Sequence, residues 1–270
     1  MPGIVVVIIL AIVQGITEFL PISSSGHLAL LGQFFGIQEI FDLAVYLHLG
    51  TLLSVITVFY RPIAKMIRGV LKGRIIIDRR VKITDKYLRV FLLVVLGSIP
   101  AAVAGLLLKD AVETSFGSAA VIGAGLIVTG VILLATRFAH NRELPNNWRR
   151  ALVTGIFQAL AIFPGISRSG MTISAGLFQG MDPVEVFEFS FLLAIPAMLG
   201  ANLMEFKNIT ASVDFASMLV GVLVSYAVGV GALFGLKKLL IRKSFYLFSI
   251  YCLLVGLLVL LSTATGLAGR

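Results

Sequence analysis

Long apolar runs recur along this chain and constrain its fold more than any other feature. Six of them come close to the roughly 20 residues that a helix needs to cross a lipid bilayer. Only 13% of the 270 residues are charged, whereas an ordinary soluble domain has about 25%. We therefore expect an all-α polytopic membrane protein, with spans at 41–60, 88–108, 117–138, 187–204, 214–236 and 245–266.

Four shorter apolar stretches, at 4–20, 27–37, 151–163 and 170–181, form two pairs. A loop rich in Pro, Gly and Ser separates the members of each pair. Neither member is comfortably long enough to cross, so we interpret each pair as a re-entrant helix–loop–helix that enters and leaves on one side. Irregular backbone is tolerated at membrane depth only where protein or a water-filled cavity surrounds it. Full crossing by the short segments remains the alternative.

The two loops lie in copies of one sequence. VQGITEFLPISSSGHL at 13–28 aligns without gaps to FQALAIFPGISRSGMT at 157–172. Three long apolar runs follow each copy, which predicts one integral membrane domain made of two repeats, 1–140 and 141–270. Because three crossings is an odd number, the repeats should have inverted topology, and the two loops should meet near the midplane about a pseudo-two-fold axis.

Lys and Arg gather in three connecting segments, 61–87, 137–150 and 237–243, and the net charge is +9. The positive-inside rule places these segments in the cytoplasm, with 109–116 and 205–213 outside. The first loop then enters from outside, so we expect a site that opens to the extracytoplasmic face of the cell (inner or plasma) membrane. Base-stacking aromatic residues do not interleave the clusters, so no nucleic-acid partner is expected. The oligomeric state stays open, with a homodimer as one option.

The two loops differ at three positions whose side chains could take part in catalysis. At matching positions the first copy carries Glu18, Ser24 and His27, where the second carries Ile162, Arg168 and Met171. Ionisable residues inside a membrane are energetically costly, and their default interpretation is functional. The duplicated scaffold is therefore predicted to divide one site between its halves.

The residue types favour phosphate chemistry. Arg168 offers a planar fork suited to phosphate oxygens, and Ser167, Ser169 and Thr172 surround it with hydroxyls. A hydroxyl or imidazole of the first loop could attack phosphorus while a neighbouring Glu or His moves the proton. The carboxylate of Glu18 could also hold a divalent cation that bridges phosphates.

Several polar residues have simpler interpretations. Ser23 and Ser25 could serve only to satisfy the loop backbone. His48, within YLHLGT, is either a packed, hydrogen-bonded histidine or a site residue. Cys252 is expected to be a small buried or lipid-facing residue.

Two motifs, QGITEFLPISSSGH at 14–27 and PGISRSGMT at 164–172, resemble those of the undecaprenyl-diphosphate phosphatase family, membrane enzymes linked to bacitracin resistance. FDLAVYLHLGTLLSV and EFSFLLAIPAMLGA are similar to that family as well. The resemblance implies a hydrolase that releases phosphate from a C55 isoprenyl diphosphate and leaves the monophosphate carrier used in cell-wall synthesis. It also implies dependence on Mg²⁺ or Ca²⁺. The first position of the family's acidic motif is Gln14 here, which removes one carboxylate and argues against a two-carboxylate metal site.

The resemblance implies Ser24 or His27 as the nucleophile. We assign attack to Ser24, general acid/base catalysis to His27, and the phosphate clamp to Arg168. Glu18 would orient His27 or bind the metal. Further substrate contacts are assigned to Ser23, Ser25, Ser167, Ser169, Thr172 and Gln14. The rival hypothesis is a transporter or flippase for a polyprenyl-phosphate lipid, since inverted repeats with broken helices are common in transporters. Pure transport needs no nucleophile beside an acid/base pair, so hydrolysis is favoured.

Overall fold

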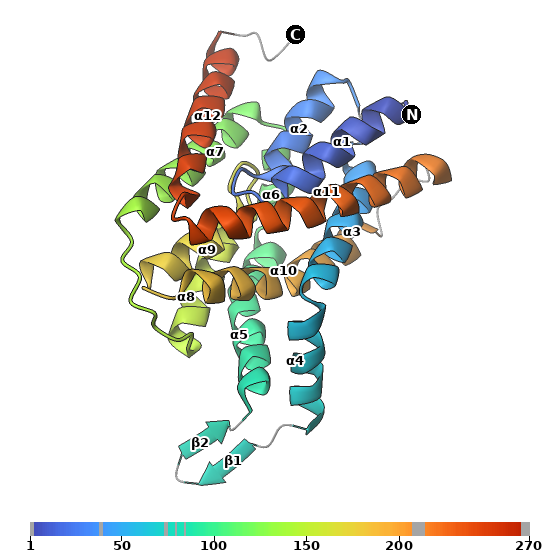
Figure 1. Ribbon diagram of the computed structural model, residues 1–270. Coiled ribbons are helices and arrows are strands. Elements are labelled where there is room, and N and C mark those ends of the chain that lie inside the picture. The colour runs from blue at the N-terminus through green and yellow to red at the C-terminus, as the bar shows by residue number, and fades with distance from the viewer. Residues whose placement is uncertain are drawn as a thin grey trace.

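The computed structural model describes residues 3–37, 40–72, 75–78, 80–83, 85–206 and 214–265, and their regular structure is helical apart from one hairpin (Figure 1). The first half contains α1 (Ile4–Thr17), α2 (Ser24–Phe34), α3 (Ile40–Val58), α4 (Tyr60–Lys72), β1 (Ile75–Asp78), β2 (Arg80–Ile83), α5 (Lys86–Leu107), α6 (Lys109–Phe116), α7 (Ala119–Ala135) and η1 (Thr136–Phe138). The second half contains α8 (Trp148–Leu160), α9 (Arg168–Phe178), α10 (Pro183–Phe206), α11 (Phe215–Ile241), η2 (Phe245–Leu247) and α12 (Phe248–Ala264). Most of the predicted outer segment 205–213, together with Arg74 and Arg79 in the basic segment 61–87, lies outside the described residues.

Five helices among the described residues are long and apolar enough to cross a membrane. They run over Lys86–Leu107, Ala119–Phe138, Pro183–Glu205, Phe215–Ile241 and Phe245–Ala264. Each corresponds to one of the six predicted spans, so the prediction of a helical, multi-pass membrane protein is confirmed.

Short polar side chains determine where the long helices begin. Asp85 accepts hydrogen bonds from the backbone N–H groups of the first turn of α5, and Asp182 does the same for α10. Asn147 caps α8 and Asp214 caps α11 in the same way. Such caps satisfy backbone donors that have no partner within the helix.

The sixth predicted span, 41–60, is broken. α3 and α4 meet at an angle of 75° around Phe59. Pro62 has no backbone N–H to donate to Val58, so the helical ladder cannot continue through this turn. The bend separates the apolar α3 from α4, which carries Lys65, Arg68 and Lys72.

The segment 61–87, predicted as a basic connecting loop, is ordered into α4 and an antiparallel hairpin. The register pairs Ile75 with Ile83 and Ile77 with Val81. Figure 1 shows the hairpin beyond the ends of α4 and α5, away from the other helices. The connecting segment therefore contains regular structure, and the β-branched residues of both strands suit a paired hairpin.

The two short-helix pairs match the predicted helix–loop–helix units. α2 and α9 begin at the corresponding residues Ser24 and Arg168, and they end at the corresponding residues Phe34 and Phe178. α1 packs along α11, and α8 packs along α5. Each unit therefore packs against a long helix of the other half, and α7 packs against α12 (Figure 1).

Candidate active site

The two loops meet, as predicted. The backbone N–H of Gly165 donates to Ser23 Oγ at 3.1 Å, and Ser169 Oγ donates to the carbonyl of Leu20 at 3.3 Å. Phe19, fully buried, fixes the first loop to α10 through an edge-to-face contact with Phe191 at 5.7 Å between ring centroids. The loops are thus held to each other and to the core.

Glycine is required where the second loop turns. Gly165 has φ +87°, a conformation that side chains rarely adopt. A Cβ on Gly165 would lie 2.2 Å from the carbonyl oxygen of Ile122 on α7. Thr129 of α7 holds the same turn, because its hydroxyl donates to Gly165 O and accepts from Ser167 N–H, both at 3.0 Å.

Most of the predicted hydroxyl cradle serves the backbone. Ser23 and Ser167 cap α2 and α9, accepting from the N–H groups of Gly26 and Gly170 at 3.4 and 3.1 Å. Ser25 and Ser169 contact these capping hydroxyls at 3.4 and 3.2 Å. Thr172 is buried against Ser190 at 2.6 Å. Ser23 thus satisfies backbone donors of both loops, and its contact with substrate stays a prediction.

Glu18 is the centre of the polar constellation. Its side chain is only 8% exposed, and Arg168 donates to its Oε1 through Nη2. Ser24 Oγ and Gln14 Nε2 donate to its other oxygen, Oε2, at 2.6 and 3.0 Å. The pairing offsets the cost of burying a carboxylate, and it brings residues of both repeats onto one group. Ser24 and Arg168 are the first residues of α2 and α9, so both helix N-termini, which favour anions, point into the site.

Only one of the two terminal nitrogens of Arg168 is paired with Glu18. Its Nη1 is buried and lacks a hydrogen-bond partner among the described residues. A buried guanidinium nitrogen left unpaired is costly, and a phosphate oxygen would satisfy it.

His27 is placed differently from our expectation. Nδ1 lies 2.7 Å from the carbonyl oxygen of Ser23, and Nε2 lies 2.7 Å from the hydroxyl of Tyr251. Within the described chain no hydrogen bond joins His27 to Glu18 or to Ser24. The predicted orientation of His27 by Glu18 therefore differs from the structure, in which Glu18 instead accepts the Ser24 hydroxyl.

Three further residues at the site come from helices distant in sequence. His48 of α3 approaches Glu18 Oε2 at 3.7 Å, so it lies beside the polar centre, and its role as a site residue stays a prediction. Tyr251 of α12 contacts His27, and Thr129 of α7 holds the second loop. Tyr251 and Thr129 lie inside long apolar runs. The sequence shows each of them there only as an isolated polar residue, which does not indicate a role at the site.

The donor set fits a divalent cation only in part. Among the described residues, no group of three His, Cys, Asp or Glu side chains could hold a metal ion. Mg²⁺ is, however, commonly bound by one or two carboxylates together with substrate phosphates and waters. Glu18 could supply one such ligand, with the remainder coming from a diphosphate.

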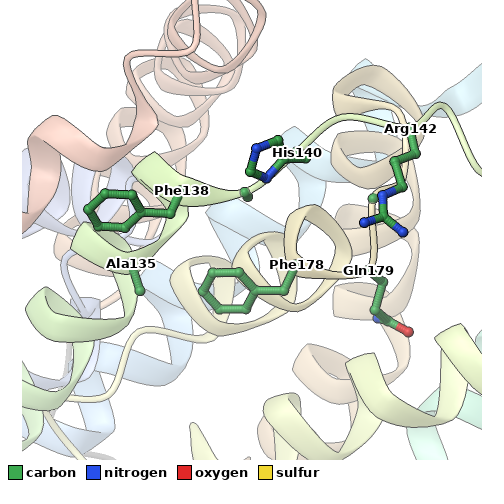
Figure 2. A pocket seen from close by; sticks show the side chains of 8 residues that line it. Ala135, Phe138, His140, Arg142, Phe178 and Gln179 are labelled. Carbon is green, nitrogen blue, oxygen red and sulfur yellow. The ribbon is translucent and has the colours of Figure 1, made fainter.

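Two cavities of the described structure lie away from this centre. One, of about 270 Å³, lies at the far end of α9 from Arg168 and is lined by Phe138, His140, Arg142 and Phe178 (Figure 2). The other, of about 730 Å³, lies between α4, α5 and the start of α10. Neither is lined by Glu18 or its partners, so the site is identified by its chemistry rather than by cavity size.

Comparison with known proteins identifies the family of the chain. The model of the bacitracin resistance protein BacA family matches residues 7–258. An undecaprenyl-diphosphatase of Desulfosudis oleivorans is 43% identical over 262 residues, covering 92% of this chain and 94% of the relative. Proteins of the same name from Desulforapulum autotrophicum and Korarchaeum cryptofilum are each 40% identical, covering 93% and 94% of this chain and 95% and 97% of the relatives. The chain therefore belongs to the BacA family of bacitracin resistance proteins.

Proposed function

We propose that this protein hydrolyses undecaprenyl diphosphate to the monophosphate lipid carrier and inorganic phosphate, which supports cell-wall precursor recycling and bacitracin resistance. The names of its relatives support the substrate. The observation that carries the chemistry is the Ser24 hydroxyl, directed at 2.6 Å onto a carboxylate that Arg168 also contacts. This is a nucleophile beside a proton acceptor and a phosphate-binding cation.

In the proposed reaction, Ser24 Oγ attacks the terminal phosphorus and Glu18 takes the hydroxyl proton. The bond between that phosphorus and the bridging oxygen breaks, and the lipid monophosphate leaves. Water then hydrolyses the phosphoserine and releases phosphate. Arg168 stabilises charge on the phosphoryl oxygens through Nη1, which has no hydrogen-bond partner among the described residues. Charge stabilisation is the main requirement of phosphoryl transfer. His27 is left to move protons at the leaving oxygen or the attacking water.

A divalent cation, Mg²⁺ or Ca²⁺, is part of the proposal. Glu18 is the protein ligand that the site offers, and the diphosphate supplies the others. When bound, the cation would neutralise charge on the phosphate oxygens. With Gln14 donating to Glu18, one protein carboxylate serves this site.

We infer further that the repeats 1–140 and 141–270 have inverted orientations. The exchange of packing partners, α1 with α11 and α8 with α5, supports a pseudo-two-fold relation. The positive-inside rule supports cytoplasmic placement of the basic segments, and so an extracytoplasmic entrance to the first loop.

The test is phosphate release from undecaprenyl diphosphate by purified protein in detergent, with and without a chelator. Wild type and Ser98→Ala should release phosphate when Mg²⁺ or Ca²⁺ is present. Ser98 is a fair control because its hydroxyl bonds only the Val94 carbonyl of its own helix. Absence of release with every metal, together with lipid movement across vesicles, would replace this proposal with the flippase hypothesis.

A further inference from the structure

We propose that Tyr251 is a positioning residue for His27: its phenol O–H holds the imidazole in the tautomer whose Nε2 is the unprotonated nitrogen. The inference rests on the proposed function, in which His27 moves protons. It concerns a residue of the C-terminal helix, outside both sequence motifs.

The tautomer follows from what each partner can do. A backbone carbonyl only accepts hydrogen bonds, so the 2.7 Å contact of His27 Nδ1 with Ser23 O requires a proton on Nδ1. In a neutral imidazole the other nitrogen is then an acceptor, and the hydrogen bond at one nitrogen determines the state of the other. The Tyr251 hydroxyl, 2.7 Å from Nε2, must therefore be the donor.

The backbone carbonyl of Ser23, which accepts the hydrogen bond from His27 Nδ1, is held firmly in place. Ser23 has φ 68°, a conformation uncommon for a residue other than glycine. Its side chain is held by the N–H groups of Gly26 and of Gly165, the latter from the opposite loop. Contact between the loops therefore fixes the oxygen that selects the His27 tautomer.

The position of Tyr251 on α12 is also fixed by packing contacts of its neighbours. Cys252, the next residue of α12, is fully buried and donates its thiol to the Pro21 carbonyl of the first loop at 3.4 Å. Gly256 lies against Gly123 of α7, where a Cβ on Gly256 would be 2.9 Å from the Gly123 carbonyl oxygen. The Tyr251 ring stacks on His27 with 15° between planes and 5.7 Å between centroids.

This geometry separates two roles in α12. Cys252 fixes the helix to the loop, whereas Tyr251 presents a hydroxyl to the nitrogen that would accept a proton. Loss of the hydroxyl should impair turnover more than binding, because His27 would keep the Nδ1 contact but lose the contact that orients its Nε2 for proton transfer.

The experiment uses the whole protein labelled with ¹⁵N-histidine and compares Tyr251→Phe with Tyr246→Phe. The chain has three histidines, so three imidazoles give signals, and His27→Gln assigns one of them. Tyr246 is a matched control because its ring faces Arg137 rather than His27. Wild type should show neutral His27 protonated at Nδ1, with a hydrogen-bonded Nε2.

In Tyr251→Phe we expect the Nε2 signal to move to the position of a free acceptor. We also expect kcat to fall by about 10- to 100-fold, the range typical of residues that orient a functional histidine, with KM within about twofold. Tyr246→Phe should match wild type in both. Wild-type His27 protonated at Nε2, or a Tyr251→Phe spectrum identical to wild type, would overturn the proposal.

The spectra are recorded without substrate, so they separate this inference from the proposed function. The expected spectra in a protein that releases no phosphate would refute the phosphatase proposal and leave the contact standing. If Tyr251→Phe does not fold, the wild-type spectrum decides: an unprotonated Nε2 that accepts a hydrogen bond supports the proposal, and a protonated or free Nε2 overturns it.

Discussion

Arg168 donates through Nη2 to Oε1 of Glu18, and this ion pair joins the two loops at their polar centre. The pair leaves Nη1 of Arg168 buried and unpartnered within the described residues. The same guanidinium can therefore hold the loops together and bind a phosphate, two roles that depend on its planar fork.

Arg168→Lys should keep the charge but lose the fork. We expect kcat/KM for phosphate release to fall by about 100-fold, comparable to removing one preorganised donor from a transition state. Arg142→Lys, in the connecting segment after α7, should retain full activity. Unchanged activity in Arg168→Lys would show that a point charge is sufficient there.

Ser24→Ala removes the proposed nucleophile and the donor to Glu18 Oε2. Phosphate release should fall on the order of 10³-fold or more, as when other enzymes lose a nucleophile. Phosphopeptide analysis of acid-quenched wild type should locate phosphate on Ser24. Near-normal turnover of Ser24→Ala would transfer the nucleophilic role to His27.

Gly165→Ala tests the turn of the second loop. A methyl group there would meet the Ile122 carbonyl and a left-handed backbone, so we expect a loss of at least about 2 kcal/mol in stability. Gly235→Ala in α11 is the control, because its Cβ would have no neighbour within 4 Å. Melting in detergent should distinguish them. Equal melting temperatures would contradict the described turn.

Metal binding should depend on the diphosphate, because Glu18 is the one carboxylate among the described residues of the two loops. Titration calorimetry with Mg²⁺ should detect no tight site in the protein alone. A non-hydrolysable diphosphate lipid should create one, and Glu18→Gln should weaken it. Tight Mg²⁺ binding without lipid would indicate protein ligands beyond this constellation.

Much of the site could be predicted from the duplicated sequence. A gapless repeat located both loops, and the residues that differ between copies, Glu18, Ser24 and Arg168, are those that converge. The pairing within the cluster could not be predicted, because it depends on how α2 is rotated and on the left-handed backbone of Ser23. His27 consequently faces Tyr251 rather than Glu18.

Contributions from distant helices were also beyond sequence reasoning. Thr129 and Tyr251 reach the loops only through tertiary packing, and a single polar side chain in an apolar run does not reveal which way it faces. His48 was recognised as an option, but the sequence could not show that it approaches Glu18. The bend between α3 and α4 was missed for another reason. Apolar residues continue to Tyr60, and the effect of Pro62 lies in the backbone hydrogen bonds.

The central claim is that the two loops form a single catalytic centre. A double-mutant cycle with Ser24→Cys and Arg168→Lys, measured as kcat/KM for phosphate release from undecaprenyl diphosphate, tests it most directly. Residues that act as a unit are strongly non-additive, so the double variant should lose about as much as the worse single variant. Losses that multiply would show that Ser24 and Arg168 act independently, and would contradict a shared site.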